Sequence, residues 1–417
     1  MHDTRTTILL ALILALPSPA SAGENWPQFR GPTADGQSDS RGLPLTWAED
    51  KNIIWKTAIH DKGWSSPVIW GQQIWMTTAR EDGKELFAVC VDRATGKIVH
   101  DLKVFDIEKP AFCIAYNSYA SSTPVIEAGR VYVHFGSAGT ACIDTATGKT
   151  LWTRIDLPCN HHRAAGSSPK LFGDLLILIF DGYDVQYVAA LDKTTGKTVW
   201  KKDRGILTYK KDDGDIKKAY GTPAVFEIEG KPQLICPSAQ ATIAYNPRTG
   251  EELWRVDHGG MNACAVPVYG HGRLYLTSGD GGDQLVAVKP EGKDPVPGSR
   301  IDWTMKKNVP SRPSLLLIGD YLYMVSNGGI ASCVDAKTGE VVATVRLKGN
   351  FAASPIYAEG RIYFVSENGP VTVVEAGREL KVLAVNELAD NCMASPAVAG
   401  SALFLRTRTH LYRIEGK

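Results

Sequence analysis

The stretch Asp144–Trp152, DTATGKTLW, decides the fold because the chain repeats it. Close copies are DKTTGKTVW at Asp192–Trp200 and NPRTGEELW at Asn246–Trp254, and weaker copies begin at Asp92 and Asp335. An Asp side chain can accept hydrogen bonds from backbone N–H groups two residues on, and Gly tolerates the positive φ of a tight turn. The motif therefore predicts a structural turn between two strands, with its Trp buried between neighbouring repeats.

A second marker accompanies the motif. It is a small-small-Pro triplet or a similar one, followed by an apolar run, a turn and a β-rich run, as in SSPVIWGQQIWM. It recurs at intervals of 41 to 57 residues, at Pro67, Pro124, Pro169, Pro223, Pro267, Pro313, Pro355 and Pro396. Such a period, with several short strands in each unit, is typical of propellers. We predict an all-β fold: an eight-bladed β-propeller of four-stranded antiparallel blades over residues 52–417.

The N-terminus is predicted to close the ring. The last repeat has room for only three strands, and an isolated segment, NIIWKTAI at Asn52–Ile59, places Trp55 where other repeats have the motif Trp. We expect this segment to be the outer strand of the eighth blade, which leaves no long open sheet edge. Residues 23–51 are rich in turn formers, and we expect them to wrap the outside of the propeller.

Residues 1–22 have the pattern of a secretory signal peptide. The apolar run Ile8–Leu16 is too short to span a bilayer, Pro17 ends it, and Ala20-Ser21-Ala22 is an A-x-A cleavage site. The alternative is a short buried helix. We expect an exported, soluble protein, periplasmic or extracellular, with no membrane span and, since no Cys follows the cleavage site, no lipid anchor.

Charge and cysteine content narrow the possible partners. The 46 Lys and Arg residues against 45 Asp and Glu give a net charge of +1, so no basic footprint for nucleic acid exists. The eight cysteines form no C-x-x-C-H haem motif and no paired C-x-x-C motifs typical of zinc, and we expect no metal. Cys113 and Cys159 hold similar places before consecutive repeats, and a disulfide between them would suit an oxidising compartment.

The D-x-x-T-G-x-x-x-W repeat, the eight units and the closing strand resemble the quinoprotein-type, PQQ-like β-propeller family, which includes BamB-type assembly factors. The resemblance covers nearly the whole chain after residue 22 and implies the fold but no single function. NWPQFRGP at Asn25–Pro32 is similar to exported members of unassigned role. Adjacent cysteines, which many quinone dehydrogenases of the family carry, are absent here, and their calcium ligands cannot be mapped. No cofactor is expected; a quinone (PQQ) with calcium is the minor alternative.

A binding site must come from loops on one face, because a fold alone does not fix function. Segments before the first strand of each blade should ring the central funnel. Aligned on the marker prolines, four of them carry an asparagine five residues earlier, namely Asn262, Asn308, Asn350 and Asn391. These amides either shape a repeated turn or form a half-ring that offers donors and acceptors to a neutral polar ligand.

The other half of the predicted funnel has more varied side chains. They precede blades 2 to 4 or lie in a blade 3 loop: Tyr116, Asn117, Tyr119, Asn160, His161, His162, Arg163, Asp181, Tyr183, Asp184 and Tyr220. The structural alternative is a solvated polar rim with satisfied histidines.

If this cluster is catalytic, His161 or His162 is the candidate acid or base, because histidine titrates near neutral pH. Arg163 could grip a carboxylate or sulfate, and Tyr183 or Tyr116 could stack on a sugar or pass a proton. Neighbouring residues of an extended loop point apart, so the two histidines should not share a metal. We predict a protein that binds a polar small molecule, a polysaccharide or a protein partner. A hydrolase or lyase of acidic polysaccharides is the first alternative, and a quinone-dependent dehydrogenase is the second.

Overall fold

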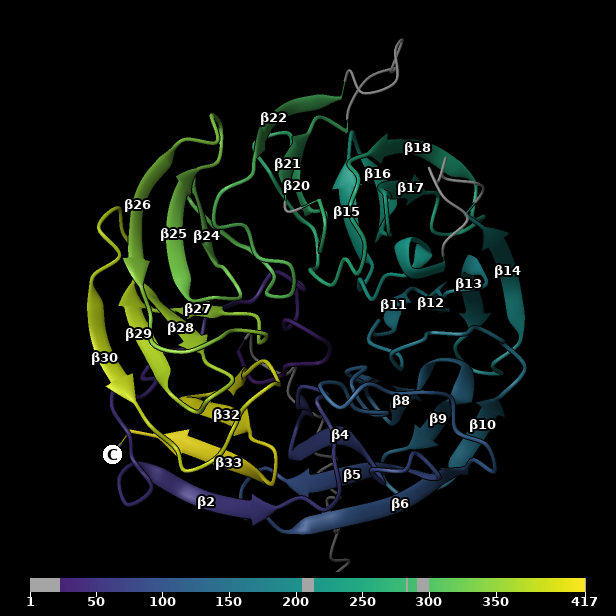
Figure 1. Cartoon of the computed structure of the whole chain (residues 1–417). Coiled ribbons are helices and arrows are strands. Elements are labelled where there is room, and N and C mark those ends of the chain that lie inside the picture. The colour runs from purple at the N-terminus through teal and green to yellow at the C-terminus, as the bar shows by residue number, and fades with distance from the viewer. Residues whose placement is uncertain (1–22, 205–213, 283, 291–299, 417) are drawn as a thin grey trace, which may run out of the picture.

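The computed structural model describes residues 23–204, 214–282, 284–290 and 300–416. Eight antiparallel sheets stand around a central axis, as Figure 1 shows, and this confirms the predicted eight-bladed propeller. In blades 1 to 7 the strands follow the chain from the axis outward. The third strands of blades 1, 2, 3 and 6 end at the Asp of the motif, as expected.

The first four blades contain β3 (Val68–Trp70), β4 (Gln73–Ala79), β5 (Glu85–Asp92), β6 (Ile98–Asp106); β7 (Val125–Glu127), β8 (Arg130–His134), β9 (Thr140–Asp144), β10 (Thr150–Arg154); β11 (Lys170–Phe172), β12 (Leu175–Asp181), β13 (Gln186–Asp192), β14 (Thr198–Asp203); β15 (Ala224–Ile228), β16 (Lys231–Pro237), β17 (Ala241–Tyr245) and β18 (Glu252–Asp257). Two short 3₁₀ helices, η1 (Gly136–Ala138) and η2 (Gly214–Lys217), lie in loops.

The last four blades contain β19 (Val268–Gly270), β20 (Arg273–Thr277), β21 (Leu285–Val288), β22 (Ile301–Met305); β23 (Leu316–Ile318), β24 (Tyr321–Val325), β25 (Ile330–Asp335), β26 (Val341–Arg346); β27 (Ile356–Ala358), β28 (Arg361–Val365), β29 (Val371–Glu375), β30 (Val382–Asn386); β31 (Ala397–Ala399), β32 (Ala402–Arg406) and β33 (His410–Glu415). The eighth blade takes its outer strand, β2 (Ile53–Ala58), from the N-terminal part of the chain. β2 pairs antiparallel with β33, with Trp55 opposite Arg413, so the predicted closure is confirmed.

The repeated motif forms the turn between the third and fourth strands. Asp144 Oδ1 accepts hydrogen bonds from the N–H groups of Ala146 (3.1 Å) and Thr147 (2.8 Å) and from the Thr147 hydroxyl (2.8 Å). These bonds hold the pKa of Asp144 below its ordinary value. Gly148 has φ +71°, which a residue with a Cβ adopts only under strain.

Most motif tryptophans pack on the glycine of the next blade's motif. The Trp152 indole lies where a Cβ on Gly196 would come within 2.7 Å of it, and Trp152 Nε1 donates to Lys193 O at 3.0 Å. Trp200 likewise covers Gly250 and donates to Pro247 O at 3.1 Å. The motif therefore connects successive blades, in addition to forming the turn between two strands.

Burial of these tryptophans differs from the prediction. Trp254 is buried, with 8% of its surface exposed, but its Nε1 donates to Gln233 of its own blade at 2.7 Å. Trp152 and Trp200 are only half-buried. They lie on the circumference of the ring, where no further strand covers the outer edge of the indole.

Only part of the N-terminal segment, residues 23–51, lies toward the outside as expected: the Trp47 N–H donates to Asn386 Oδ1 of the outer strand β30 at 2.8 Å. Residues 26–38, which we call the axial strap, run along the inner strands near the axis (purple in Figure 1). Trp26 bridges Ile69 of β3, and strand β1 (Gln37–Ser38) pairs in parallel with β27. Pro27 O accepts the Ile126 N–H at 2.8 Å. The inner strands leave unpaired backbone groups at the axis, and the strap satisfies some of them.

A ring of hydroxyl side chains links the inner ends of the blades. The residue two positions before the inner strand is Ser or Thr in seven blades, and we call these residues the hydroxyl ring: Ser66, Thr123, Ser168, Thr222, Ser314, Ser354 and Ser395. The Ser66 N–H donates to Thr123 Oγ1 (2.9 Å), and the same step recurs from blade to blade. The Ser395 N–H donates to Ser66 Oγ (3.0 Å) across the closure.

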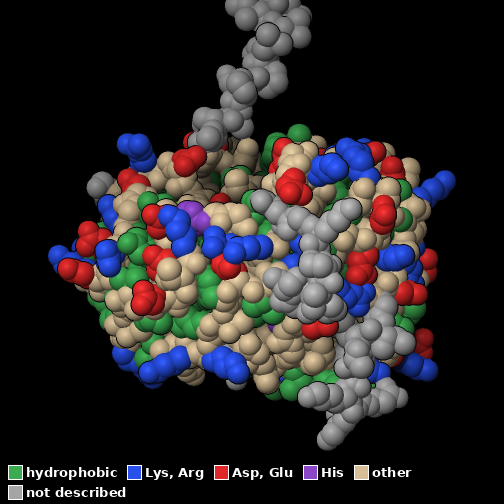
Figure 2. Space-filling view, turned by 90° about the horizontal axis from the view of Figure 1, so that it is seen from above, with side chains coloured by type: hydrophobic (Ala, Val, Ile, Leu, Met, Phe, Trp, Pro, Cys, Tyr) green, Lys and Arg blue, Asp and Glu red, His purple; other side chains and the backbone are tan. Residues whose placement is uncertain are grey.

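Surface charge on the propeller is mixed. Figure 2 shows Lys and Arg interspersed with Asp and Glu, in keeping with the net charge of +1. In the part of the chain that the structure describes, no helix is both long and apolar enough to span a membrane. Residues 1–22, and with them the predicted signal peptide, lie outside the described residues.

Candidate ligand-binding site in the central funnel

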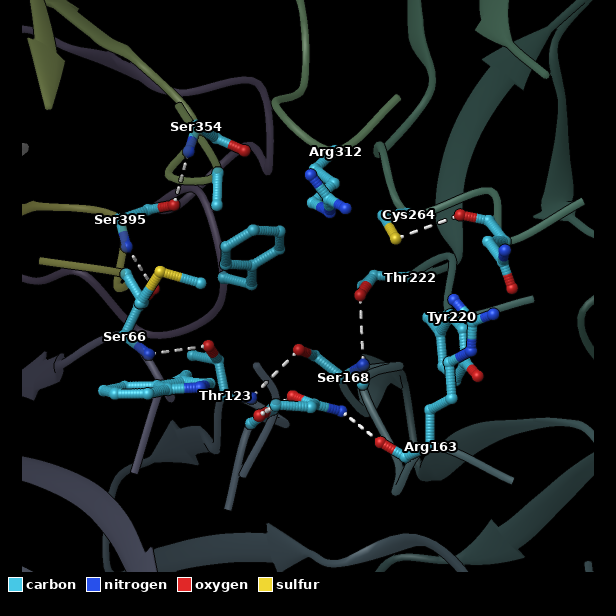
Figure 3. Close-up of a pocket in the computed structure, with 18 of the residues that line it drawn as sticks. Ser66, Thr123, Arg163, Ser168, Tyr220, Thr222, Cys264, Arg312, Ser354 and Ser395 are labelled. Atoms are coloured by element: carbon cyan, nitrogen blue, oxygen red, sulfur yellow. Dashed lines mark hydrogen bonds between the residues drawn. The ribbon is translucent and has the colours of Figure 1, made fainter. Parts of the chain in front are cut away.

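A cavity of about 200 Å³ lies at the axis, where the loops before the inner strands converge (Figure 3). Members of the hydroxyl ring line it, together with Phe29 from the axial strap. Above the ring, one residue from every blade lines the cavity, each two positions before the hydroxyl-ring position: Trp64, Ser121, Gly166, Tyr220, Cys264, Arg312, Ala352 and Met393. Alternate residues of an extended segment face the same side, so each blade supplies two adjacent layers of the wall.

Arg312 is the cavity group with the most unused hydrogen-bonding capacity. Its guanidinium carbon lies 4.8 Å from the centre of the Tyr116 ring, a cation–π contact. Within the described part of the chain it makes no hydrogen bond and no ion pair. A guanidinium carries five N–H donors, so Arg312 can bind a carboxylate or a similar anion in the cavity.

The charged residues that line the cavity carry a net positive charge. Arg163 also lines it, and among the described residues its guanidinium makes one long ion pair, 3.7 Å, to Asp215. Asp280 is the carboxylate among the lining residues, and its Oδ2 accepts a hydrogen bond from Asn262 Nδ2 at 3.1 Å. Two guanidinium groups against one carboxylate favour an anionic ligand.

Tyr116 reaches from the loop before blade 2 toward blades 6 and 7. Its hydroxyl donates to Glu367 Oε1 at 2.5 Å, its ring receives Arg312, and its backbone oxygen accepts Trp64 Nε1 at 3.1 Å. Burial and the Glu367 contact raise the pKa of Tyr116, so the hydroxyl stays protonated. This side chain therefore lines the cavity and ties opposite sides of the funnel together.

Five of the predicted site residues line the cavity: Tyr116, Asn117, Arg163, Tyr220 and Asn262. Asn117 Nδ2 donates to Arg163 O at 2.7 Å, and the Tyr220 hydroxyl donates to His161 O at 3.1 Å. These bonds join the loops before blades 2, 3 and 4, so these predicted residues lie together at the cavity wall.

His161 does not face the cavity, contrary to its predicted place at the funnel mouth. Its side chain is buried, Nε2 accepts the Ser137 N–H at 3.2 Å, and Nδ1 lies 3.7 Å from Cys159 Sγ. Burial lowers the pKa of His161 to about 4. Its surroundings are those of a satisfied core histidine, because the polar turn that carries it folds inward.

Asn160 and Asp184 shape the loop that carries His162. Asn160 Oδ1 accepts the His162 N–H at 3.0 Å, and Asp184 Oδ1 accepts the Asn160 N–H at 2.8 Å. His162 has φ +62° and is half-buried, whereas the neighbouring His161 is buried. The His162 ring lies 5.2 Å from the Tyr183 ring, and neither belongs to the cavity lining.

Asp181 and Tyr119 also lie away from the cavity. Asp181 Oδ2 is 3.0 Å from Arg204 Nη1, and both side chains are fully buried. Burial raises the pKa of Asp181 to about 6, against the opposing effect of Arg204. The Tyr119 hydroxyl donates to Ala111 O at 2.7 Å, and its ring covers Gly83. Both residues pack the scaffold between blades.

The predicted asparagine half-ring does not form. Asn308 falls out of register, because Leu315 rather than Pro313 occupies the marker position of blade 6, directly before β23. Asn350 and Asn391 are exposed, and their backbone oxygens accept loop N–H groups of Glu367 (2.8 Å) and Arg408 (2.8 Å). The turn-shaping alternative accounts for these residues, and Asn262 alone reaches the cavity wall.

The expected Cys113–Cys159 disulfide is absent from the structure. All eight cysteines, which lie within the described residues, are free thiols. Cys159 is buried and faces His161, whereas Cys113 is half-buried, with its Sγ 3.5 Å from Ile114 O. The similar sequence positions do not bring the two side chains together, because the loop before blade 3 turns inward.

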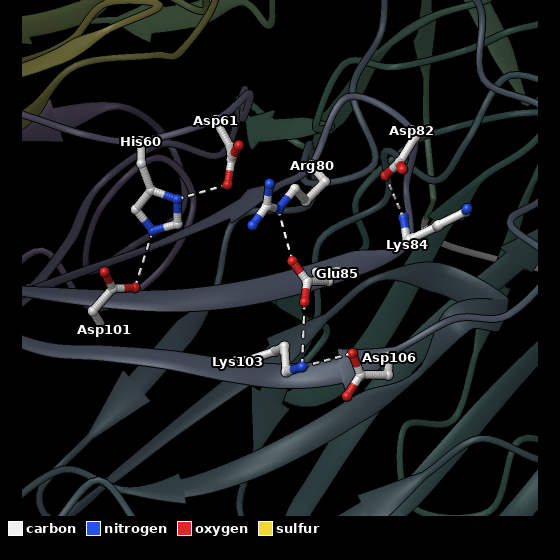
Figure 4. Close-up of polar contacts among 9 residues, drawn as sticks. All are labelled: His60, Asp61, Arg80, Asp82, Lys84, Glu85, Asp101, Lys103 and Asp106. Atoms are coloured by element: carbon white, nitrogen blue, oxygen red, sulfur yellow. Dashed lines mark hydrogen bonds and ion pairs between the residues drawn. The ribbon is translucent and has the colours of Figure 1, made fainter.

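Charged residues on blade 1 form a second cluster, and Figure 4 shows that its members satisfy one another. The His60 ring lies between Asp61 (2.7 Å) and Asp101 (3.0 Å). Glu85 lies between Arg80 (2.7 Å) and Lys103 (3.2 Å). These ion pairs account for most charges of the cluster, and Lys84 joins it through its backbone N–H, which donates to Asp82 Oδ1 at 3.0 Å.

The family model described as outer membrane protein assembly factor BamB matches residues 38–154, 238–296 and 298–414, more than half of the chain. The chain belongs to the BamB family. A BamB of Shewanella oneidensis is 22% identical over 299 residues, which cover 67% of this chain and 70% of that protein. A quinoprotein ethanol dehydrogenase of Pseudomonas aeruginosa is 32% identical over 142 residues, 32% of this chain and 22% of that protein.

Solved structures share the fold of this BamB-family chain. BamB from Moraxella catarrhalis superposes with a TM-score of 0.60 at 15% identity, covering 88% of this chain and 97% of that one. A quinohemoprotein alcohol dehydrogenase from Comamonas testosteroni gives 0.67 at 11% identity, covering 95% and 82%. At these identities the likeness concerns the fold alone, so the cavity must decide between ligands.

The cavity does not suit a quinone paired with calcium. Its arginines could pair with a quinone's carboxylates, but calcium takes six to eight oxygen ligands, usually with several carboxylates. Asp280 is the one carboxylate in the lining, and it already accepts a bond from Asn262. No three His, Cys, Asp or Glu side chains gather as a metal site in the described ranges.

Proposed function

We propose that this BamB-family propeller binds a small anionic molecule in its central cavity. The supporting observation is Arg312, a guanidinium at the cavity wall that pairs with no anion among the described residues. A half-buried charge without a partner is costly, and a bound carboxylate would remove that cost. Arg163, from the loop before blade 3, lines the same cavity and adds a second positive charge.

Binding is favoured over catalysis. The hydrolase or lyase alternative needs an acid or base at the ligand, and His161 is buried away from the cavity. The dehydrogenase alternative needs a calcium-bound quinone, for which the cavity offers a single carboxylate. Addition of quinone and calcium, followed by absorbance and dye reduction, would overturn this choice if it produced turnover.

Calorimetric titration with succinate, citrate, sulfate and a uronic acid tests the proposal. At least one anion should bind, and Arg312→Gln should weaken it by roughly tenfold or more, the usual worth of a charge-assisted bond. The matched control is Arg378→Gln: Arg378 also lies over a tyrosine ring, that of Tyr321 at 5.9 Å, but outside the cavity. The proposal fails if no anion binds or if both variants behave alike.

We also propose that the protein is exported with its leader removed. Cleavage after Ala22 would leave Gly23 as the first residue and keep Trp26, the first pairing residue of the axial strap, intact. N-terminal sequencing of protein secreted from a heterologous host should begin at Gly23. A retained Met1 would contradict this.

A further inference from the structure

We infer that the anionic ligand is an acidic saccharide, with a uronic acid residue in the cavity and a second sugar ring on an aromatic patch at the rim. This rests on the proposed function, because Arg312 would hold the carboxylate. Two independent features point to a sugar: the donor-rich base of the cavity and the row of exposed rings beside it.

The base of the cavity presents hydroxyl hydrogens. Thr123 Oγ1, Ser168 Oγ and Thr222 Oγ1 each accept the backbone N–H of the preceding blade, at 2.9 to 3.0 Å. Ser66 and Ser395 accept in the same way. A hydroxyl has one hydrogen to donate, and with one lone pair used in this way that hydrogen can turn toward the cavity. All five residues line the cavity, so its base suits an oxygen-rich ligand.

The same donor excess disfavours a peptide. A peptide carries as many backbone N–H donors as C=O acceptors, and its donors would need acceptors in the wall. The charged acceptor in the wall is Asp280, which already accepts a bond from Asn262. A uronic acid brings a carboxylate, a ring oxygen and hydroxyls that can act as acceptors, and therefore fits two arginines and a ring of hydroxyls.

Three side chains form the rim patch: Phe112, His162 and Tyr183. The His162 ring lies 5.9 Å from Phe112 and 5.2 Å from Tyr183. Phe112 is 62% exposed and Tyr183 39% exposed, which is unusual for large apolar rings. Aromatic faces of this kind pack against the C–H faces of sugar rings.

The rim patch is continuous with the cavity along two loops. Arg163 follows His162 directly and lines the cavity, and Ile114 and Tyr116 follow Phe112 and line it from the next loop. In this inference the cavity holds one sugar ring, and a longer saccharide continues outside it. The rim patch is where the second ring would lie.

The test is calorimetry on the mature chain with galacturonate, glucuronate, disaccharides ending in each, galactose, and the peptide Gly-Gly-Phe. One uronate should bind, galactose should bind at least tenfold more weakly, and the matching disaccharide should bind about tenfold more tightly than the monosaccharide. In the Phe112→Ala variant, the dissociation constants of the acidic monosaccharide and of its disaccharide should differ by no more than about twofold. The dissociation constant of the monosaccharide should be unchanged. The control Val199→Ala, at an exposed residue of the outer strand β14, should change neither.

The outcomes separate this inference from the proposed function. If succinate or citrate binds through Arg312 but no uronate does, the inference of a saccharide ligand is wrong, and the proposed anion-binding function still holds. A tighter complex with the peptide than with any uronate also overturns the saccharide. A disaccharide advantage that survives Phe112→Ala overturns the rim patch. If Arg312→Gln affects no ligand, the proposed function and this inference both fail.

Discussion

Gly196 has two separate reasons to be glycine, and the structure distinguishes them. Its φ is +71°, and a Cβ would lie 2.7 Å from the Trp152 indole of the preceding blade. The first reason is evident in the sequence, because a turn between strands predicts positive φ. The second needs the relative position of two blades, which no local pattern gives.

Gly196→Ala should therefore lower the free energy of unfolding by about 2–4 kcal/mol, from backbone strain plus overpacking. The matched control is Gly173→Ala, which has φ +58° but nothing within 4 Å of the added Cβ. It should cost only about 1 kcal/mol. Reversible urea unfolding of both variants measures the difference, and equal losses would show that the indole contact is unimportant.

His161 should make stability fall in mild acid. Its folded pKa of about 4 lies below the ordinary value of 6.5, so between these values the unfolded chain binds a proton that the native state does not. The His161 contribution is thus present above pH 6.5 and is lost as the pH falls toward 4, by about 2 kcal/mol at pH 5.

Urea unfolding of wild type and His161→Gln at pH 7.5 and pH 5 isolates this effect from that of other groups. The variant should lose less stability between the two pH values, since glutamine can still accept the Ser137 N–H but does not titrate. His162→Gln, at the half-exposed neighbour, is the control. An identical pH dependence for His161→Gln and wild type would contradict the assignment.

At the scale of elements, the four-strand repeat was predictable and the axial strap was not. The repeat spacing, the glycine turns and the Asp that ends the third strand identify the strands from the local sequence. β2 could be identified as the missing strand because Trp55 repeats the motif Trp. The strap has no repeat partner. Its position depends on free backbone groups at the axis, which exist only once the ring has closed.

Trp26→Ala should destabilise the protein strongly. Trp26 is 1% exposed and bridges β3, so its loss should cost about 3–5 kcal/mol. Phe29→Ala, at the half-buried strap residue in the cavity, should cost less stability but weaken anion binding, because it opens the cavity base. Thermal unfolding and calorimetry on both variants check this. A small effect of Trp26→Ala would mean that the strap is detachable.

At the scale of the whole molecule, the ring decides which residues meet. The predicted asparagines lie five positions before the marker proline, whereas the cavity-facing position lies four residues before the inner strand of each blade. That position reads Trp64, Ser121, Gly166, Tyr220, Cys264, Arg312, Ala352 and Met393, with no repeated residue type to reveal it. The position could have been found from the Ser or Thr that follows it two residues later in seven blades, because alternate residues of an extended segment face the same side.

The free cysteines give a test at this scale. With no disulfide in the fold, mature protein that is purified without reductant and then denatured should show eight thiols by titration with a thiol reagent. Reductant should leave the melting temperature unchanged, because no cross-link constrains the unfolded chain. A count of six, with a lower melting temperature after reduction, would restore the Cys113–Cys159 pairing.

The sequence by itself determined the eight-bladed architecture, the turns and the closing strand, because each depends on contacts between residues close in the chain or on their exact repetition. The tertiary structure decided the site. Arg312 and Tyr116 are nearly two hundred residues apart, and Phe29 meets them only because the strap runs along the axis. His161 was predicted at the funnel because its segment precedes the inner strand of blade 3, yet its side chain lies in the core, where Nε2 accepts the Ser137 N–H. Local patterns fix local geometry, whereas a cavity at the centre of a ring is made by the residues that ring closure happens to bring together.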